Sequence, residues 1–233
     1  MGWHDRDLEQ VYDELDADET GLDSEEVEKR REEHGDNSIE SGDSLSPVKI
    51  CISQFQDALV YMLIAAAIVS IGVGFLPGEE ARVTEAGLIV FILVLNGIFG
   101  FIQDYRAEKS IQALRQMSQP DTKVLRDGEK IEVDSSKLVP GDVIFLEPGT
   151  SVPADARLIE SEGLDTDESS LTGESDEVDK KAETLDEDTP LAERTNMVFK
   201  NTNAVNGSGK AVVVETGMDT QVGDIAEQLN QAE

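Results

Sequence analysis

The 233-residue sequence predicts an α+β membrane protein with short N-terminal helices, a two-helix transmembrane hairpin that continues into a cytoplasmic stalk, and a small mainly β domain. Three observations lead to this fold class: two long uncharged apolar runs, apolar residues at helical spacing on either side of them, and a change to alternating β-branched residues from Asp121 onward. We therefore expect an N-terminal cytoplasmic helical segment, a transmembrane hairpin, a stalk helix and a β domain, at residues 1–56, 57–104, 105–119 and 120–233.

The N-terminal segment predicts two short amphipathic helices separated by Gly21. One face of the first helix collects four apolar residues, namely Leu8, Val11, Tyr12 and Leu15. Asp23, with Glu26 three residues later, predicts a capping box for a second helix over 24–34, which Gly35 ends.

Two apolar runs define the predicted membrane hairpin. The run at about 58–78 has 21 uncharged residues and the run at about 86–103 has 18. At ~1.5 Å per residue the first run matches the ~30 Å hydrocarbon core of a bilayer, and the second is at the short end of the range of about 17–25 residues that span it. The alternative, two buried core helices of a soluble protein, is disfavoured because neither run has a polar face. We therefore expect a multi-pass protein of the cell membrane, with the lipid bilayer as a partner.

Basic residues near the ends of these runs predict the orientation of the hairpin. The polar link between the runs carries only Arg82, whereas the outer flanks carry Lys49 on one side and Arg106, Lys109 and Arg115 on the other. Because Lys and Arg are retained on the cytoplasmic side, both flanks and both termini are expected in the cytoplasm.

The second run should continue as a stalk. Residues 105–119 keep strong helix formers, and Ala107, Ile111 and Leu114 recur at i, i+4 and i+7 until Pro120 ends the pattern.

The segment after Pro120 predicts a mainly β domain. Residues 122–133 form a hairpin pattern around Asp127-Gly128, further strands are expected in the stretches DVIFLEPG, ARLIES and GKAVVVETG, and a final helix begins at or just before Thr220. The stretch Asn206–Ala211, NGSGKA, lacks the residues that complete a phosphate-binding loop, so we expect a Gly-rich hairpin turn there.

Composition excludes several classes of function. The chain has 50 Asp and Glu against 19 Lys and Arg, for a net charge of −31, so nucleic acid is not expected as a partner. This charge is halophile-like, because high salt screens self-repulsion; the alternative is an acidic protein without that adaptation. His4, His34 and Cys51 are the only residues of their types, so no zinc site or Ser-His-Asp triad is expected. No metal site is predicted: the stretch DADETG resembles the start of a calcium loop, but Val27 occupies the position of its bidentate Glu.

The stretch Asp167–Ser175, DESSLTGES, carries the candidate catalytic residue Glu174. Gly173 allows a positive φ, so the carboxylate could reach a substrate as a general base or orient a water molecule for attack on an acyl or phosphoryl group. Nothing nearby supplies the group to be attacked. On local chemistry alone, a capped surface turn is therefore the favoured interpretation.

Four stretches together change that balance: GLDSEEVEKRREEHGDNSIE, FIQDYRAEKSIQALRQM, LVPGDVIFLEPGTSVPADARLIES and DTDESSLTGES. In this order and spacing, the sequence resembles the N-terminal part of cation-transporting P-type ATPases, in particular the type II, calcium-pump-like branch, over essentially the whole chain. The β domain then resembles the actuator domain of that family.

The resemblance implies a mechanism in which ATP phosphorylates an aspartate in a separate domain. Glu174 would position the water that hydrolyses the aspartyl phosphate, Thr172 and Gly173 would shape the loop against the phosphate, and Ser175 would hold its geometry. ATP and Mg²⁺ are expected to bind outside this chain, and the stalk would carry actuator rotation to the membrane helices.

The sequence departs from the family in two details and in one large feature. Glu177 replaces a usual proline and Asn201 replaces a common glycine, and no Asp-Lys-Thr-Gly-Thr stretch is present. We therefore expect the leading portion of a pump that is inactive without its phosphorylation and nucleotide domains. Calcium is the favoured cation, with sodium, potassium and protons open. The alternatives are a stand-alone two-span regulator and an acidic membrane-tethered binding module, both without catalysis.

Overall fold

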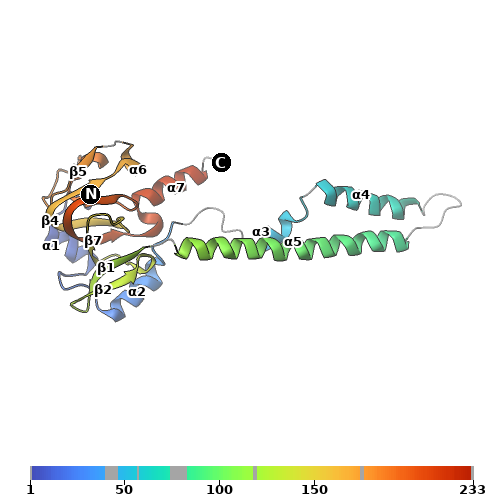
Figure 1. The fold of residues 1–233 in the computed structure, drawn as a ribbon, viewed down its shortest axis with the longest axis horizontal. Helices are drawn as coiled ribbons and strands as arrows, with labels where there is room; N and C mark the ends of the chain where they lie inside the picture. The colour runs from blue at the N-terminus through green and yellow to red at the C-terminus, as the bar shows by residue number, and fades with distance from the viewer. Residues whose placement is uncertain are drawn as a thin grey trace. The chain divides into compact units, whose positions relative to one another are not determined.

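The computed structural model describes residues 2–39, 47–56, 58–73, 83–117, 120–173 and 176–231. The chain forms two compact units, one of residues 1–42 with 119–233 and the other of residues 43–118. The first unit contains the β-sheet and the second contains the apolar helices (Figure 1).

The first unit is built on a seven-stranded antiparallel sheet with the order β2-β1-β3-β7-β4-β5, in which β6 also pairs with β4. The strands are β1 (Asp121–Arg126), β2 (Glu129–Asp134), β3 (Val143–Leu146), β4 (Asp155–Asp167), β5 (Glu177–Asp179), β6 (Met197–Val198) and β7 (Asn203–Glu215).

Several predicted strands are confirmed. β1 and β2 form the expected hairpin, with φ of 51° at Asp127 and 73° at Gly128, the left-handed pair that a two-residue turn requires. The other three predicted strands correspond to β3, β4 and β7, of which β4 and β7 are 13 residues long and extend beyond the predicted stretches.

The prediction of a hairpin turn at Asn206–Ala211 is wrong. These residues lie inside β7, opposite an irregular part of β4 where the register shifts between Glu162 and Asp165. Gly207 has a φ of 63°, and a Cβ atom there would lie 1.9 Å from the carbonyl oxygen of Gly163. The glycines therefore serve a β-bulge with close backbone contact instead of a chain reversal.

Successive apolar side chains of the central strands point to opposite faces of the sheet and contribute to two apolar clusters. In β3, Val143 belongs to one cluster and Ile144 to the other; in β7, Val212 and Val213 divide in the same way. α1 (Leu8–Leu15) adds Val11 and Leu15 to the cluster of Val143 and Val212. The period-two pattern thus places apolar residues on both faces of the sheet, and the N-terminal segment packs against one of them.

The two predicted N-terminal helices are confirmed as α1 and α2 (Ser24–His34). The Asp23 carboxylate accepts a hydrogen bond from the backbone N–H of Glu26 at 2.8 Å, and Gly35 ends α2 with a φ of 76°. The reciprocal half of the capping box is replaced by an ion pair, because the Glu26 carboxylate lies 2.8 Å from Nε of Arg30.

The final predicted helix is α7 (Gln221–Gln231), which follows the short 3₁₀ turn η4 (Gly217–Asp219). Thr220 Oγ1 accepts a hydrogen bond from the backbone N–H of Gly223 at 3.2 Å, as the predicted cap requires. The remaining short elements are α6 (Ser169–Thr172), η2 (Ser135–Lys137) and η3 (Leu191–Glu193).

The second unit consists of α3 (Pro47–Ser53), α4 (Ala58–Gly72) and α5 (Val83–Met117), with α5 packed against α3 and α4. Within α5, residues Thr84–Ala107 are long and apolar enough to cross a membrane, with a mean hydropathy of 2.2. The described part of the first predicted run is the shorter helix α4, and residues 74–78 of that run, like the link at 79–82, lie outside the described residues.

α5 continues as one helix of 35 residues from its apolar part to Met117 (Figure 1). This agrees with the predicted continuation of the second run, up to residues 118–119, which lie outside the described residues. α3 had no counterpart in the sequence prediction. Large apolar side chains on α4 and α5 are exposed in the chain alone, as a helix pair in contact with lipid requires; they include Met62, Ile68, Leu88, Phe91 and Phe99.

Candidate functional site

The candidate loop closes the hairpin between β4 and β5. Asp167 pairs with Glu177 and Thr166 with Val178, so both ends of the loop are fixed by strand pairing. Thr172 and Gly173 lie in this loop. Glu174 and Ser175 lie outside the described residues, so of the four predicted site residues the structure places only Thr172 and Gly173.

A short helix, α6, shapes the first half of the loop. Its last residue is Thr172, and the N–H of Gly173 donates a hydrogen bond to the carbonyl oxygen of Ser169 at 3.0 Å. Gly173 has a φ of 77°, which agrees with the expectation that glycine allows a positive φ there. A side chain at this position would be strained, because the left-handed region is unfavourable for residues with a Cβ atom.

Glu168 holds the base of the loop from within. Its carbonyl oxygen accepts hydrogen bonds from the N–H groups of Leu171 and Thr172 at 2.9 Å and from Thr172 Oγ1 at 3.1 Å. Its side chain is 1% exposed, and the carboxylate Oε1 lies 2.5 Å from Nζ of Lys180 and accepts a hydrogen bond from Thr166 Oγ1 at 3.1 Å.

Lys180 follows β5 and is equally buried, with 1% of its surface exposed. Burial lowers the pKa of Lys180, and the neighbouring Glu168 carboxylate opposes that shift. The ammonium also lies 3.4 Å from the carbonyl oxygen of Arg194 and 5.5 Å from the ring centroid of Phe199. A buried ammonium is costly without such a counter-charge, so the pair depends on both partners.

The outer side of the loop has a second attachment. Ser170 Oγ donates a hydrogen bond to the carbonyl oxygen of Asn201 at 3.1 Å, and Leu171 packs against the apolar cluster of α1. Asn201 has a φ of 64°, a conformation that glycine and asparagine adopt more readily than other residues. The sequence departure at Asn201 therefore keeps the backbone conformation that a glycine would allow.

An ionised carboxylate stands at the start of the loop. Asp167 Oδ1 accepts a hydrogen bond from the N–H of Ser169 at 3.0 Å. The Ser169 hydroxyl and, next, this N–H lower the pKa of Asp167. Among the described residues, no group of three or more His, Cys, Asp or Glu side chains could hold a metal ion.

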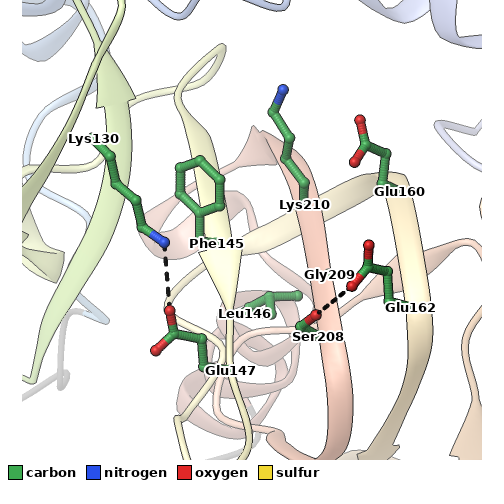
Figure 2. Close-up of a pocket in the computed structure, with 9 residues that line it drawn as sticks. All are labelled: Lys130, Phe145, Leu146, Glu147, Glu160, Glu162, Ser208, Gly209 and Lys210. Carbon is green, nitrogen blue, oxygen red and sulfur yellow. Dashed lines mark hydrogen bonds and ion pairs between the residues drawn. The ribbon is translucent and has the colours of Figure 1, made fainter.

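A pocket of about 220 Å³ lies elsewhere on the sheet, across β2, β3, β4 and β7 (Figure 2). The ammonium of Lys130 lies 4.1 Å from the ring centroid of Phe145 and 3.4 Å from the carboxylate of Glu147. Neither Thr172 nor Gly173 lines this pocket, whose charged lining consists of two lysines and three glutamates. It therefore holds none of the described residues of the candidate site.

Sequence reasoning missed Glu168 and Lys180 as residues that organise the site. They are twelve positions apart, and their contact depends on the register of a hairpin whose second strand, β5, has only three residues. A strand this short gives almost no periodicity signal. The position of Glu168 directly before the Ser-Ser-Leu-Thr turn was the only available indication.

Two protein families match parts of this chain. The family described as the P-type ATPase actuator domain matches residues 116–230, and the family described as the N-terminus of cation transporters and ATPases matches residues 3–70. The two matches cover the β-sheet unit, the N-terminal helices and part of the apolar region.

Full-length relatives agree with the family matches. A calcium-transporting ATPase of Listeria monocytogenes is 40% identical over 96% of this chain and 25% of its own length. A calcium-transporting ATPase of Bacillus subtilis is 42% identical over 91% of this chain and 23% of its own length. A sodium/potassium exporting P-type ATPase of Schizosaccharomyces pombe is 39% identical over 91% and 20%, respectively. This chain thus spans between a fifth and a quarter of the length of these relatives. It belongs to the P-type cation-transporting ATPases and carries their N-terminal region with the actuator domain.

Proposed function

We propose that this chain acts as the leading part of an ATP-driven cation pump, in which Glu174 promotes hydrolysis of an aspartyl phosphate held by a domain outside residues 1–233. The observation that carries this proposal is the fixed turn before Glu174. α6 ends at Thr172, which bonds the carbonyl oxygen of the buried Glu168, and Gly173 adopts a left-handed conformation with its N–H bonded to the carbonyl oxygen of Ser169. Glu174 follows this turn directly in a domain of the actuator family.

Hydrolysis of the aspartyl phosphate requires the loop to place one carboxylate beside the attacking water. A water oxygen attacks phosphorus, the bond between phosphorus and the aspartate oxygen breaks, and phosphate leaves. Glu174 accepts a hydrogen bond from the attacking water and takes its proton as the new bond forms. Thr172 and Gly173 shape the loop against the phosphate, and Ser175 holds the geometry of Glu174. Correct placement of a nucleophile alone lowers a barrier by several kcal/mol.

The continuous helix α5 supports a mechanical role for the stalk. Because no break separates its apolar part from Met117, movement at the cytoplasmic end is transmitted along the helix axis. In the proposed pump, residues 57–104 lie in the membrane, residues 105–119 form the stalk and residues 120–233 form the actuator domain. Residues 1–56 and 120–233 lie in the cytoplasm.

Calcium is the cation we favour for the complete pump. The Listeria and Bacillus relatives are named as calcium-transporting, whereas the Schizosaccharomyces relative is named as exporting sodium and potassium. ATP and Mg²⁺, which the family uses, would bind to domains outside this chain. Cation-dependent phosphorylation of a complete pump, compared among Ca²⁺, Na⁺ and K⁺, tests the choice of ion.

The test of the proposed mechanism uses a chimera in which this chain replaces the matching region of the Bacillus subtilis relative. The unmodified chimera must first form and hydrolyse a phosphoenzyme. Glu174→Ala should leave phosphoenzyme formation from ATP unchanged and slow its decay by about a hundredfold or more, the usual effect of losing a general base. Glu177→Ala, which removes an exposed carboxylate three residues later, is the matched control. Unchanged decay in Glu174→Ala would overturn the proposal.

A further inference from the structure

We infer that the buried ion pair between Glu168 and Lys180 is a positioning device that holds the loop of Glu174 in its working geometry. This inference rests on the proposed function, because it assigns to Glu168 and Lys180 the task of placing Glu174. Neither of the two residues is itself a catalytic residue. They act on the reaction through the short helix α6 and Gly173.

The place of the pair in the fold favours this role. Glu168 is the last residue before α6, and Lys180 is the first residue after β5. The pair therefore ties together the two ends of the segment that contains Glu174. Strand pairing ends at Asp167 and Glu177, so the ion pair adds a side-chain link to the backbone link at the base of the loop.

Glu168 passes this restraint to the turn before Glu174. The same residue whose carboxylate contacts Lys180 accepts three hydrogen bonds at its carbonyl oxygen, from Leu171 N–H, Thr172 N–H and Thr172 Oγ1. A rotation of Glu168 would move Thr172 and, through it, Gly173. The path from Lys180 to the residue before Glu174 thus consists of two direct contacts and one peptide bond.

The energetics of the pair point away from a purely stabilising role. Both side chains are 1% exposed, and transfer of two charges from water into the interior offsets much of their mutual attraction. Among the described residues, Glu168 Oε2 is buried without a hydrogen-bond partner, so the carboxylate is held through Oε1 alone. Replacement of such a buried pair by apolar residues of similar size is often neutral or stabilising. The fixed geometry is what the charges add.

The kinetic test uses Lys180→Met, Glu168→Gln and the double variant in the chimera. Each single variant should slow phosphoenzyme decay by about ten- to a hundredfold, the usual effect of a misplacement of about 1 Å, and leave phosphoenzyme formation unchanged. The double variant removes the unpaired buried charge, so its thermal stability should recover while its decay stays slow. Decay that recovers together with stability would show a structural role only and overturn the inference.

A second buried ion pair provides the matched control. Arg126 Nη2 lies 2.6 Å from the Asp142 carboxylate, and the two residues are 9% and 0% exposed. Their pair joins β1 to the start of β3, and its hydrogen bonds to Lys137 and Val139 lie outside the loop. Arg126→Met should lower thermal stability as Lys180→Met does but leave the decay rate unchanged. Equal slowing of decay in both variants would overturn the inference.

Amide hydrogen exchange of the 233-residue chain separates the inference from the proposed function. In Lys180→Met, the exchange of the Thr172 and Gly173 N–H groups should accelerate at least tenfold more than that of Val212 and Val213 in β7, which follows the global loss of stability. If the exchange of the two loop amides accelerates no more than that of the β7 amides, the pair does not fix the loop and the inference fails. If it accelerates selectively and Glu174→Ala still decays normally, the proposed role of Glu174 fails instead.

Discussion

Asp155 Oδ2 accepts a hydrogen bond from the backbone N–H of Gln221 at 2.8 Å, so a carboxylate at the start of β4 lies at the N-terminus of α7. The other carboxylate oxygen accepts a hydrogen bond from the N–H of Lys200 at 2.7 Å. Asp155 is fully buried, and one side chain thus joins β4, the segment before β7 and the first turn of the last helix. The positive end of the helix dipole favours a carboxylate at this position.

This buried carboxylate predicts a measurable pH dependence. Burial raises the pKa of Asp155 from 3.8 to about 6, although hydrogen bonds from the N–H groups of Lys200 and Gln221 oppose the shift. The folded protein therefore binds this proton more tightly than the unfolded chain. The contribution of Asp155 to the free energy of unfolding is fully present below about pH 4 and is lost as the pH rises through about 6, by about 3 kcal/mol in total.

The difference in unfolding free energy between wild type and Asp155→Asn isolates this contribution, because the other titrating groups are common to both proteins. It should shrink as the pH rises from 4 to 7. Trp3, the single tryptophan, donates a hydrogen bond to Glu215 in the β-sheet unit, so its fluorescence in detergent reports the unfolding of that unit. A difference that is constant over this range, or that grows, would contradict the prediction.

Substitution of Asn201 by glycine and by valine should change the free energy of unfolding in opposite directions. Asn201→Gly should raise the free energy of unfolding by up to about 1 kcal/mol, because glycine adopts a φ of 64° without strain. Asn201→Val should lower it by about 1–3 kcal/mol, because a β-branched residue is strained in the left-handed region. The hydrogen bond of Ser170 goes to the backbone oxygen of residue 201, so all variants retain it.

Asn203→Val is the control for the substitution at Asn201. Asn203 begins β7, where valine is favoured, and its substitution should leave the free energy of unfolding almost unchanged. Thermal unfolding followed by Trp3 fluorescence measures all three variants. Equal destabilisation by valine at positions 201 and 203 would show that the backbone conformation of Asn201 does not matter for stability.

Elements with complete local signals could be predicted from the sequence. The turn Asp127-Gly128 sets its own hairpin, and Asp23 and Gly35 mark both ends of α2, because each signal acts within a few residues. Gly207 was misjudged because a bulge and a turn use the same residue types. The two differ only in whether a partner strand, here β4 at Gly163, continues alongside.

Some features of the candidate site could likewise be predicted from the sequence, and others could not. The positive φ of Gly173 follows from local chemistry, and the importance of the Thr-Gly-Glu-Ser loop came from the resemblance to a family. The burial of Glu168 and Lys180 could not be predicted, because charged residues are normally exposed. The residues that contact Lys180 in the interior, Phe199 and Arg194, are also distant from it in the sequence.

Cys51 allows a direct test of the predicted orientation in the membrane. It is the single cysteine of the chain and is exposed on α3, on the N-terminal side of the first apolar helix. Because most Lys and Arg near the helix ends lie on the outer flanks, Cys51 should face the cytoplasm. A membrane-impermeant maleimide should therefore label it only after the cells are opened.

The reverse pattern is expected for a cysteine in the polar link. In Cys51→Ser with Glu80→Cys, the same reagent should label intact cells, because the link faces the opposite side of the membrane from both flanks. Labelling of Cys51 in intact cells would show that the orientation is the reverse of the predicted one.

Equal labelling at both positions in opened cells, together with recovery of the protein in the soluble fraction, would instead show that α4 and α5 are core helices of a soluble assembly. Retention in the membrane with opposite labelling at the two positions requires an odd number of crossings between residues 51 and 80. The uncharged run at 58–78, of which the structure describes residues 58–73, has the length for one crossing.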